Sequence, residues 1–269
     1  MELTDFEYAG EKLSAKGCVV CAFGGSDMET ISLGSNLTFT TTRDNNSSEQ
    51  RKISTTYDVY APEVIQIMKY DCKTLSYKSF TQDEVSDFMM WLNRKSYKKF
   101  RPIYDDNVYT GIYFYGSFNV QAKALDGDII GLELTFNTNS PYGYKEISPI
   151  QKTVGANSSI TIKTDSDEEG IIYPTVSVKC TSGGLLKIIN SKDSTSTIVQ
   201  NCVAGETITF DGKTRQIVSS ATSHVTLAAD YNYHAPRLLT KRGDDTNVLT
   251  FSLPCTVDIR FSPIRKVGI

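Results

Sequence analysis

The sequence has little of the material from which most catalytic and metal sites are built. Of its 269 residues only two are histidines, His224 and His234, and six are cysteines. A nucleophile elbow, a phosphate-binding loop, a dinucleotide fingerprint and an HExxH motif are all missing. So few histidines leave little for a catalytic triad or a zinc site. We therefore expect no enzyme activity, no metal and no cofactor.

The chain also lacks an excess of one charge and a long apolar run. Its formal net charge is −3 and 22% of its residues are charged, unlike a basic nucleic-acid-binding protein or an acidic disordered chain. It begins MELTDFEYAG, with acidic residues where a signal peptide carries basic ones, and no segment resembles a membrane span. We expect a protein made soluble in the cytoplasm, with no sequence-specific nucleic-acid binding and no membrane insertion.

The cysteines show no dense disulfide framework. Cys18 and Cys21 have the CxxC spacing of zinc and thiol-redox sites, but no second CxxC follows. In a strand over residues 17–23 their side chains would point to opposite faces, because the side-chain period of a strand is two. We predict free, mostly buried thiols at all six positions: Cys18, Cys21, Cys72, Cys180, Cys202 and Cys255.

One stretch, residues 80–100, is typical of a helix. Thr81 and Glu84 have the spacing of a capping box, which predicts where the helix begins. Acidic residues then come early and basic residues late, as the helix dipole favours. Apolar residues recur at helical spacing with the only Trp beside them. We predict a helix over 81–94 that packs against a sheet through Val85, Phe88, Met89, Trp91 and Leu92.

The rest of the chain shows the alternation of apolar and polar residues that indicates strands. The turn dipeptide Asp126-Gly127 lies between two such runs and predicts a hairpin. The polar residues 43–51 predict a protruding loop. In the first half we predict strands over 17–23, 52–60, 63–70, 112–120 and 130–136.

From residue 137 to 170 the chain becomes rich in Pro, Gly, Asn and Ser, as at a crossing between domains. Eight short strands with no helical period then follow, with Gly183-Gly184 and Asp211-Gly212 as turns, which predicts a β-sandwich. We predict two domains, 1–150 and 151–269.

Three features of the second half invite a functional interpretation. Residues 165–170 begin like a calcium loop, but the twelfth position is Val176, so we expect a solvated turn. Arg242-Gly243-Asp244 matches an adhesion tripeptide and equally suits a hairpin loop. The tyrosines of loop-like stretches suit stacking on a sugar ring, or alternatively a protein interface. The candidate glycan contacts are Tyr231 and Tyr233.

The order of these elements carries a resemblance. The first half contains DFEYAGEKLSAKGCVVCAF and FTQDEVSDFMMWLNRKSYKKF, and the second contains TIVQNCVAGETITFDGKTRQIVSS and TNVLTFSLPCTVDIRFSPIRKV. In this order, over the full length, the chain resembles the distal tail proteins (Dit) of long-tailed bacteriophages and prophage-derived particles. The resemblance implies an N-terminal β-sandwich with one α-helix, followed by a galectin-like, jelly-roll type β-sandwich.

The resemblance also implies an architectural function in the virion, at the tail tip, after synthesis in the host cytoplasm. Copies of such a protein form a homo-hexameric ring that joins the tail tube protein to the tail tip or hub protein and offers its outer domains to a receptor-binding protein. Strand edges that pair with another copy would suit such a ring. Our hypothesis is that residues 52–70 and 109–120 supply these edges.

Two other functions remain open at this point. The first alternative is a carbohydrate-binding adhesion module that acts through the C-terminal sandwich. A more distant one is a glycosidase of the sandwich type, because a pair of acidic residues can be brought together by the fold.

Overall fold

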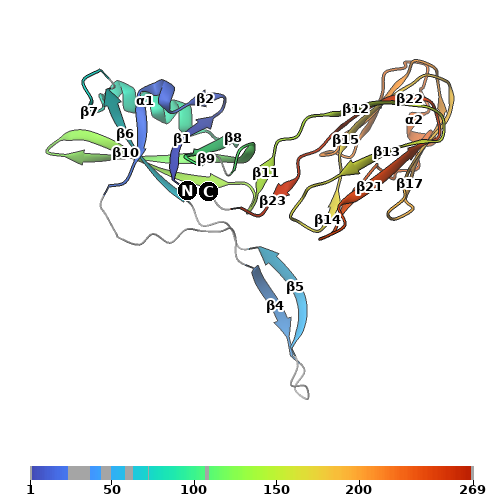
Figure 1. Ribbon diagram of the computed structural model, residues 1–269, viewed down its shortest axis with the longest axis horizontal. Coiled ribbons are helices and arrows are strands. Elements are labelled where there is room, and N and C mark those ends of the chain that lie inside the picture. Colours follow the sequence, from blue (N-terminus) through green and yellow to red (C-terminus); the bar gives the residue numbers. More distant parts are fainter. Residues whose placement is uncertain are drawn as a thin grey trace. The chain divides into compact units, whose positions relative to one another are not determined.

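The computed structural model describes residues 2–23, 37–43, 50–57, 63–71, 73–106 and 109–267 (Figure 1). The chain is divided into two compact units. Unit 1 comprises Met1–Lys145 with Arg265–Ile269, and unit 2 comprises Glu146–Ile264. Strands dominate both units, so the predicted mainly β fold is confirmed. Cys72, most of the predicted loop 43–51 and the end of the predicted strand 52–60 lie outside the described residues.

Unit 1 is built on one antiparallel sheet whose strands follow the path β2-β1-β8-β9-β10-β6-β3. Strand β7 adds to β6, β11 adds to β9, and β23 adds to β11. The two sides of the path approach each other, because β1 contacts β3, so the sheet curls over one core. The strands are β1 Leu3–Tyr8, β2 Glu11–Lys12, β3 Cys18–Cys21, β6 Glu63–Asp71, β7 Ser76–Lys78, β8 Lys98–Tyr104, β9 Ile112–Leu125, β10 Asp128–Thr138, β11 Gly143–Lys145 and β23 Ile264–Arg265.

The predicted hairpin is present as β9 and β10. Leu125 pairs with Asp128 across the turn, and the two turn residues, Asp126 and Gly127, have φ angles of 51° and 92°. Positive φ at both positions is what a two-residue hairpin turn requires, and it suits the Asp-Gly dipeptide.

Helix α1 (Gln82–Leu92) begins where the capping box predicts. The Thr81 N–H donates to Glu84 Oε2 at 2.9 Å and the Glu84 N–H donates to Thr81 Oγ1 at 3.3 Å. The helix ends two residues earlier than predicted. Asn93 leaves helical geometry, and Arg94 instead exchanges hydrogen bonds with Ser117 of β9: its N–H donates to Ser117 Oγ, and its carbonyl accepts from the same hydroxyl.

The packed face of α1 contains four of the five predicted residues. Phe88, Trp91 and Leu92 are buried, and Val85 is half-buried against the same core. Met89 is 38% exposed and does not belong to the packed face, contrary to the prediction. Trp91, which belongs to the predicted set, lies inside the core, whereas Met89 faces solvent.

Aromatic rings make up most of the core of unit 1. Phe100 lies at its centre, with ring centroids 4.5 Å from Phe136 and 5.4 Å from Phe118. Trp91 stacks on Phe6 at 5.9 Å and donates its indole N–H to the Tyr8 carbonyl at 3.1 Å. These contacts fix the helix against the curled sheet.

The last described residues return to unit 1, although the predicted second domain, 151–269, includes them. Strand β23 pairs with β11, Lys266 Nζ lies 5.6 Å from the centre of the Tyr142 ring, and Val267 packs against the aromatic core. No helix in the part of the chain that the structure describes has the length and apolar character needed to span a membrane.

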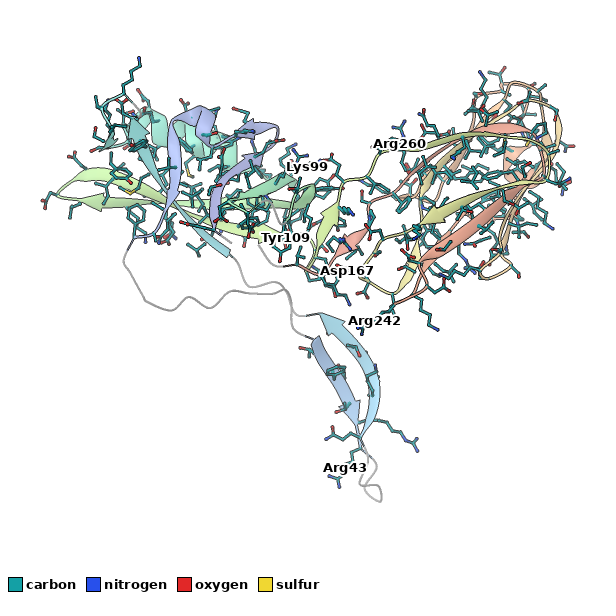
Figure 2. All side chains as sticks on the ribbon, viewed as in Figure 1. Arg43, Lys99, Tyr109, Asp167, Arg242 and Arg260 are labelled. Atoms are coloured by element: carbon teal, nitrogen blue, oxygen red, sulfur yellow. The ribbon has the colours of Figure 1, made fainter. Side chains whose placement is uncertain are left out.

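A separate two-stranded sheet is formed by β4 (Leu37–Thr42) and β5 (Arg51–Tyr57), which pair antiparallel. Figure 2 shows its side chains, with Arg43 labelled at the end of β4. The sequence predicted β5 but missed β4. Residues 38–43 and 50–56 are all exposed.

Unit 2 is a sandwich of two antiparallel sheets over one apolar core, as predicted. The sheet orders are β12-β22-β15-β18-β19 and β13-β21-β16-β17, with β14-β20 as a small third pair. The galectin-like, jelly-roll topology implied by the resemblance stays a prediction. The elements are β12 Ile150–Val154, β13 Ser158–Lys163, β14 Gly170–Ile172, β15 Thr175–Cys180, β16 Gly184–Asn190, β17 Ser196–Cys202, β18 Thr207–Phe210, β19 Ile217–Ser219, α2 Leu227–Asp230, β20 Leu238–Thr240, β21 Thr246–Phe251 and β22 Cys255–Arg260.

Candidate functional site

Two of the strands that our hypothesis assigns to ring edges, β6 and β9, lie inside the sheet of unit 1. On β6, Ile67 pairs with Leu132 of β10 on one side and with Val20 of β3 on the other. On β9, Gly116 pairs with both Lys98 of β8 and Thr138 of β10. Residues 66 and 67 of β6 and Gly116 of β9 therefore have a strand on both sides and offer no free edge. The hypothesis is wrong at these positions and stays a prediction for the rest of residues 63–70 and 109–120.

Other strands do present edges. Among the described residues β3 pairs only with β6, and β5 pairs only with β4. The β4–β5 sheet also exposes two large apolar side chains, Phe39 at 55% and Ile53 at 66%. A strand with unpaired N–H and C=O groups is a template for another strand. The part of the hypothesis that concerns residues 52–57 therefore stays a prediction.

A cavity of about 380 Å³ lies beside helix α1 in unit 1. Its apolar floor includes Phe80, Phe88 and Trp91. Two lysines beside it are engaged within the unit: Lys69 is paired with Glu84, and Lys16 Nζ lies 5.3 Å from the centre of the Trp91 ring. The hydrogen bond from Lys69 and the capping bonds hold the pKa of Glu84 below its usual value. These charges serve the cap and the packing of the helix.

A second cavity, of about 290 Å³, lies in unit 2 and contains both candidate glycan contacts. We call it the tyrosine groove. Three tyrosines and two arginines converge on it from β-strand connections and from the segment after α2. Its lining residues are Tyr173, Thr195, Arg215, Tyr231, Tyr233, His234, Ala235 and Arg237.

The two predicted tyrosines do different things. Tyr231 is only 6% exposed and packs against Phe210, with ring centroids 5.9 Å apart, and burial raises its pKa to about 12. It therefore belongs to the core and offers no open stacking face, contrary to the prediction. Tyr233 is 72% exposed. Its ring lies 5.3 Å from that of Tyr231, and its O–H donates to the Ala228 carbonyl at 2.8 Å.

Sequence reasoning missed the arginines of the groove. Arg215 stacks over the Tyr173 ring, with its guanidinium carbon 4.1 Å from the ring centre. Arg237 donates to Asp193 at 2.7 Å and to Thr195 Oγ1 at 2.6 Å. Nothing near these positions in the sequence forms a motif, because residues separated by tens of positions meet here only through the pairing of the strands.

Behind the segment that carries the tyrosines lies a buried ionisable cluster. His224 Nδ1 is 2.7 Å from Glu206 Oε1, and His224 Nε2 is 3.1 Å from Asp230 Oδ2 at the end of α2. Burial alone would lower the pKa of His224, but the hydrogen bonds to the two carboxylates outweigh it and raise that pKa. Glu206 also accepts from the Val203 N–H at 2.8 Å. Burial opposes ionisation of Glu206, yet its hydrogen bonds hold its pKa below the usual value.

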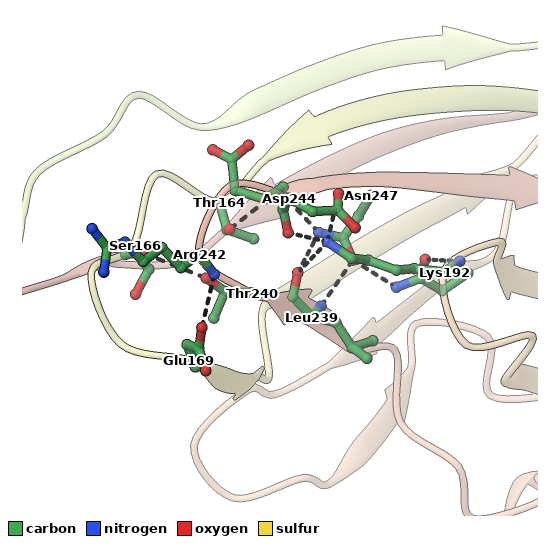
Figure 3. Close-up of polar contacts among 11 residues, drawn as sticks. Thr164, Ser166, Glu169, Lys192, Leu239, Thr240, Arg242, Asp244 and Asn247 are labelled. Atoms are coloured by element: carbon green, nitrogen blue, oxygen red, sulfur yellow. Dashed lines mark hydrogen bonds and ion pairs between the residues drawn. The ribbon is translucent and has the colours of Figure 1, made fainter.

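The remaining candidate motifs of the second half form one end of unit 2 (Figure 3). Glu169, from the calcium-like stretch, accepts a hydrogen bond from the Arg242 N–H at 3.0 Å. Asp244, from the same hairpin, pairs with Lys192 at 3.1 Å. In the chain as described, no three His, Cys, Asp or Glu side chains gather as metal ligands would. The two stretches therefore hold each other as connected loops.

The CxxC cysteines lie on β3. Cys18 is buried, and burial raises its pKa to about 12. Cys21 is half-buried, and burial raises its pKa as well. A raised pKa keeps a thiol protonated and weakly reactive. Cys180, Cys202 and Cys255 are free and buried in unit 2.

Comparison with known families decides the class of protein. One family model, described as a phage tail protein N-terminal domain, matches residues 1–140, and a second, described as a phage tail C-terminal domain, matches residues 142–261. The chain belongs to this family of phage tail proteins. No curated protein matches its sequence.

One solved structure shows where its fold recurs. The crystal structure of the SPP1 Dit (gp 19.1) protein matches this tail protein with a TM-score of 0.66 at 10% identity, covering 98% of this chain and 100% of that one. The predicted resemblance to the distal tail proteins is thus confirmed at the level of the fold, over the whole length. Chains of the phage p2 baseplate in its activated conformation, with Ca and with Sr, match with TM-scores of 0.47 and 0.46 at 9% and 8% identity. They cover 99% and 96% of this chain and 100% and 98% of theirs.

Proposed function

We propose that this tail protein is a structural adaptor at the distal end of the tail. Copies of the chain form a ring, a homo-hexamer by resemblance, that joins the tail tube protein to the tail tip or hub protein and to the receptor-binding apparatus. In this role it acts without cofactor or catalysis and resides in the virion. The observation that carries the proposal is the full-length match to the SPP1 Dit protein, which is described as a paradigm of the hub adsorption apparatus in phages that infect Gram-positive bacteria.

Features of unit 1 support self-association. The β4–β5 sheet is isolated from other strands among the described residues, and a two-stranded sheet alone is only marginally stable in water. It carries the exposed Phe39 and Ile53. Pairing with a neighbouring copy would satisfy its free backbone groups and cover these apolar side chains. Helix α1 has a different role in this proposal, because its aromatic face is already buried in its own core.

The mass of the purified chain in solution tests the proposal. Six copies of a 29.8 kDa chain amount to about 179 kDa, which light scattering separates clearly from a monomer. Electron micrographs of the same sample, with and without tail tube protein, should show annuli. A chain that stays monomeric in both samples at high concentration would contradict the proposed ring.

Substitutions then locate the interface. Ile53→Lys places a charge on the exposed face of β5 and should abolish the ring if that sheet pairs between copies. Met90→Lys is the matched control, since Met90 is similarly exposed, at 61%, but lies on α1. Loss of the ring in the Met90 variant alone would move the interface to the helix.

A further inference from the structure

The tyrosine groove of unit 2 has the composition of a ligand site and lies in a part of the chain to which the proposed ring assigns no chemistry. We propose that it binds a saccharide that carries an acidic group, with one sugar ring on Tyr233 and the carboxylate or phosphate on Arg215. The groove's volume of about 290 Å³ is at the lower end of the range of small-ligand pockets, roughly 300–1,000 Å³, so it suits one or two sugar rings.

Tyr233 is held as a fixed platform. Although 72% of it is exposed, its hydroxyl is bonded to the Ala228 carbonyl and its ring rests against the buried Tyr231. Tyr231 is in turn part of the apolar core. An aromatic ring that is both exposed and immobilised loses little side-chain entropy when a ligand covers it. It therefore provides a flat apolar face for the C–H groups of a pyranose.

Arg215 provides the charge. Its guanidinium stacks on Tyr173, and among the described residues none of the ion pairs involves it. The second arginine of the groove, Arg237, is neutralised by Asp193. One arginine thus presents an uncompensated, orientated guanidinium, which binds a carboxylate or a phosphate in a bidentate manner.

Backbone geometry supports a functional reason for this arrangement. Tyr233 and Arg215 have φ angles of 59° and 58°, a left-handed conformation that bulky residues adopt at a cost in free energy. Such strain is concentrated at binding sites, where it fixes the direction of a side chain. In the tyrosine groove the two residues that would contact the ligand are the two with this left-handed backbone conformation.

The combination favours an acidic saccharide over other anions. A nucleic acid needs several basic residues along a path, whereas this groove offers one free arginine. An acidic peptide would use the arginine but would have no use for an immobilised flat ring. A sugar with one acidic group per few rings uses both features at once.

Isothermal titration calorimetry on the full chain tests the proposal with defined probes. Hyaluronan tetrasaccharide carries carboxylates, polyribitol phosphate carries phosphates, cellotetraose is neutral and tetraglutamate is an acidic peptide. We expect one of the two acidic carbohydrates to bind with at least about tenfold higher affinity than cellotetraose and tetraglutamate, because only the acidic sugars use both Tyr233 and Arg215. The carbohydrate that binds identifies the source of the acid.

Variants link the binding to the groove. Tyr233→Ala should lower the affinity for the acidic saccharide about tenfold or more, and Arg215→Leu should remove the preference for the acidic over the neutral sugar. The control is Tyr97→Ala, which removes an exposed tyrosine of unit 1 and not of the groove. It should leave the affinity unchanged. Arg215 lies on an exposed turn, so its variant keeps the test available if Tyr233→Ala does not fold.

Three results would overturn the proposal: neither acidic carbohydrate binds at millimolar concentration, tetraglutamate binds more tightly than both, or the affinity is the same in all three variants. Ring formation is measured separately by light scattering. Failure of the groove to bind a saccharide therefore leaves the proposed adaptor role untouched, and the reverse also holds.

Discussion

The two units of this tail protein bury different kinds of side chain. Unit 1 packs phenylalanine, tyrosine and tryptophan rings between its curled sheet and helix α1. Unit 2 has a mostly aliphatic core with free cysteines. It also contains every buried polar or charged residue, tyrosine and cysteine aside, among those that the structure describes: Thr164, Asn190, Thr197, Glu206, His224, Thr240 and Asn247.

The two units are therefore stabilised in different ways, unit 1 mainly by buried aromatic rings and unit 2 also by buried polar networks. Burial of aromatic rings does not require an ionised group, so the stability that it gives to unit 1 should depend little on pH. Buried polar groups must find partners with defined geometry, and they fix the positions of the chains that provide them. In unit 2 these hydrogen-bonded networks lie next to the loops between the strands, where a fixed position of the chain shapes the tyrosine groove.

The largest effect is expected from removal of one ring in unit 1. Phe118 is 1% exposed and contacts Phe6, Tyr8, Phe100 and Phe136. Phe118→Ala should lower the free energy of unfolding of unit 1 by about 4 kcal/mol, because the cavity adds to the lost burial. The fluorescence of Trp91, the only Trp of the chain, reports on this unit alone in a urea titration.

Phe39→Ala is the control for this substitution, since Phe39 is 55% exposed and its truncation should change stability by less than about 0.5 kcal/mol. Equal shifts of the Trp91 transition in the two variants would show that the aromatic cluster is not what stabilises unit 1.

A smaller, pH-dependent effect is expected in unit 2 from the His224 cluster. The pKa of His224 is raised above its ordinary value of 6.5, so the folded state holds the proton more tightly than the unfolded chain. The resulting stability is fully present below pH 6.5 and is lost as the pH rises through the raised value. The pKa values of Glu206 and Asp230 are lowered, so their contribution is instead lost when the pH falls through those lowered values.

Amide hydrogen exchange of β18 and β19 between pH 6 and pH 9, corrected for intrinsic rates, measures this dependence. His224→Gln should lower stability by about 3 kcal/mol at pH 6, since it removes one partner of a buried charge pair, and by less at pH 9. His234→Gln is the matched control, because His234 is the other histidine and is exposed. Parallel pH profiles of the His224 variant and the unsubstituted chain would contradict the assignment.

The sequence predicted best what is decided locally. The capping box of Thr81 and Glu84 marks the start of α1, and the Asp126-Gly127 dipeptide marks the β9–β10 turn, because both depend on neighbouring residues. The partners of β6 and the burial of Tyr231 depend on strands far along the chain. Their local sequence is compatible with an edge strand or an exposed loop, and only the completed sheets decide.

The candidate site shows the same limit more strongly. Tyr233 was accessible to sequence reasoning as a loop tyrosine, but Arg215 and Tyr173 were not. Arg215 lies in the turn after Asp211-Gly212, and Tyr173 precedes β15. They meet because β15 pairs with β18, a long-range contact that leaves no periodic signal in either segment.

The smallest predicted effect is a difference in stability between alanine and glycine variants at one backbone position in each unit. Arg215 has a φ of 58°, whereas Ser86 is an exposed residue inside α1. At Ser86, alanine should be more stable than glycine by about 1 kcal/mol, the usual helix preference. At Arg215 the order should be reversed by about 1 kcal/mol, because glycine adopts the left-handed region without the clash of a Cβ atom. Both replacements at one position remove the same side-chain contacts, so the difference in stability between them isolates the contribution of the backbone.

Thermal unfolding of the four variants, followed by circular dichroism, gives the sign of the stability difference between alanine and glycine at each position. If alanine is the more stable residue at both positions, the backbone at Arg215 stores no strain, and the case for a built groove in unit 2 rests on Tyr233 alone.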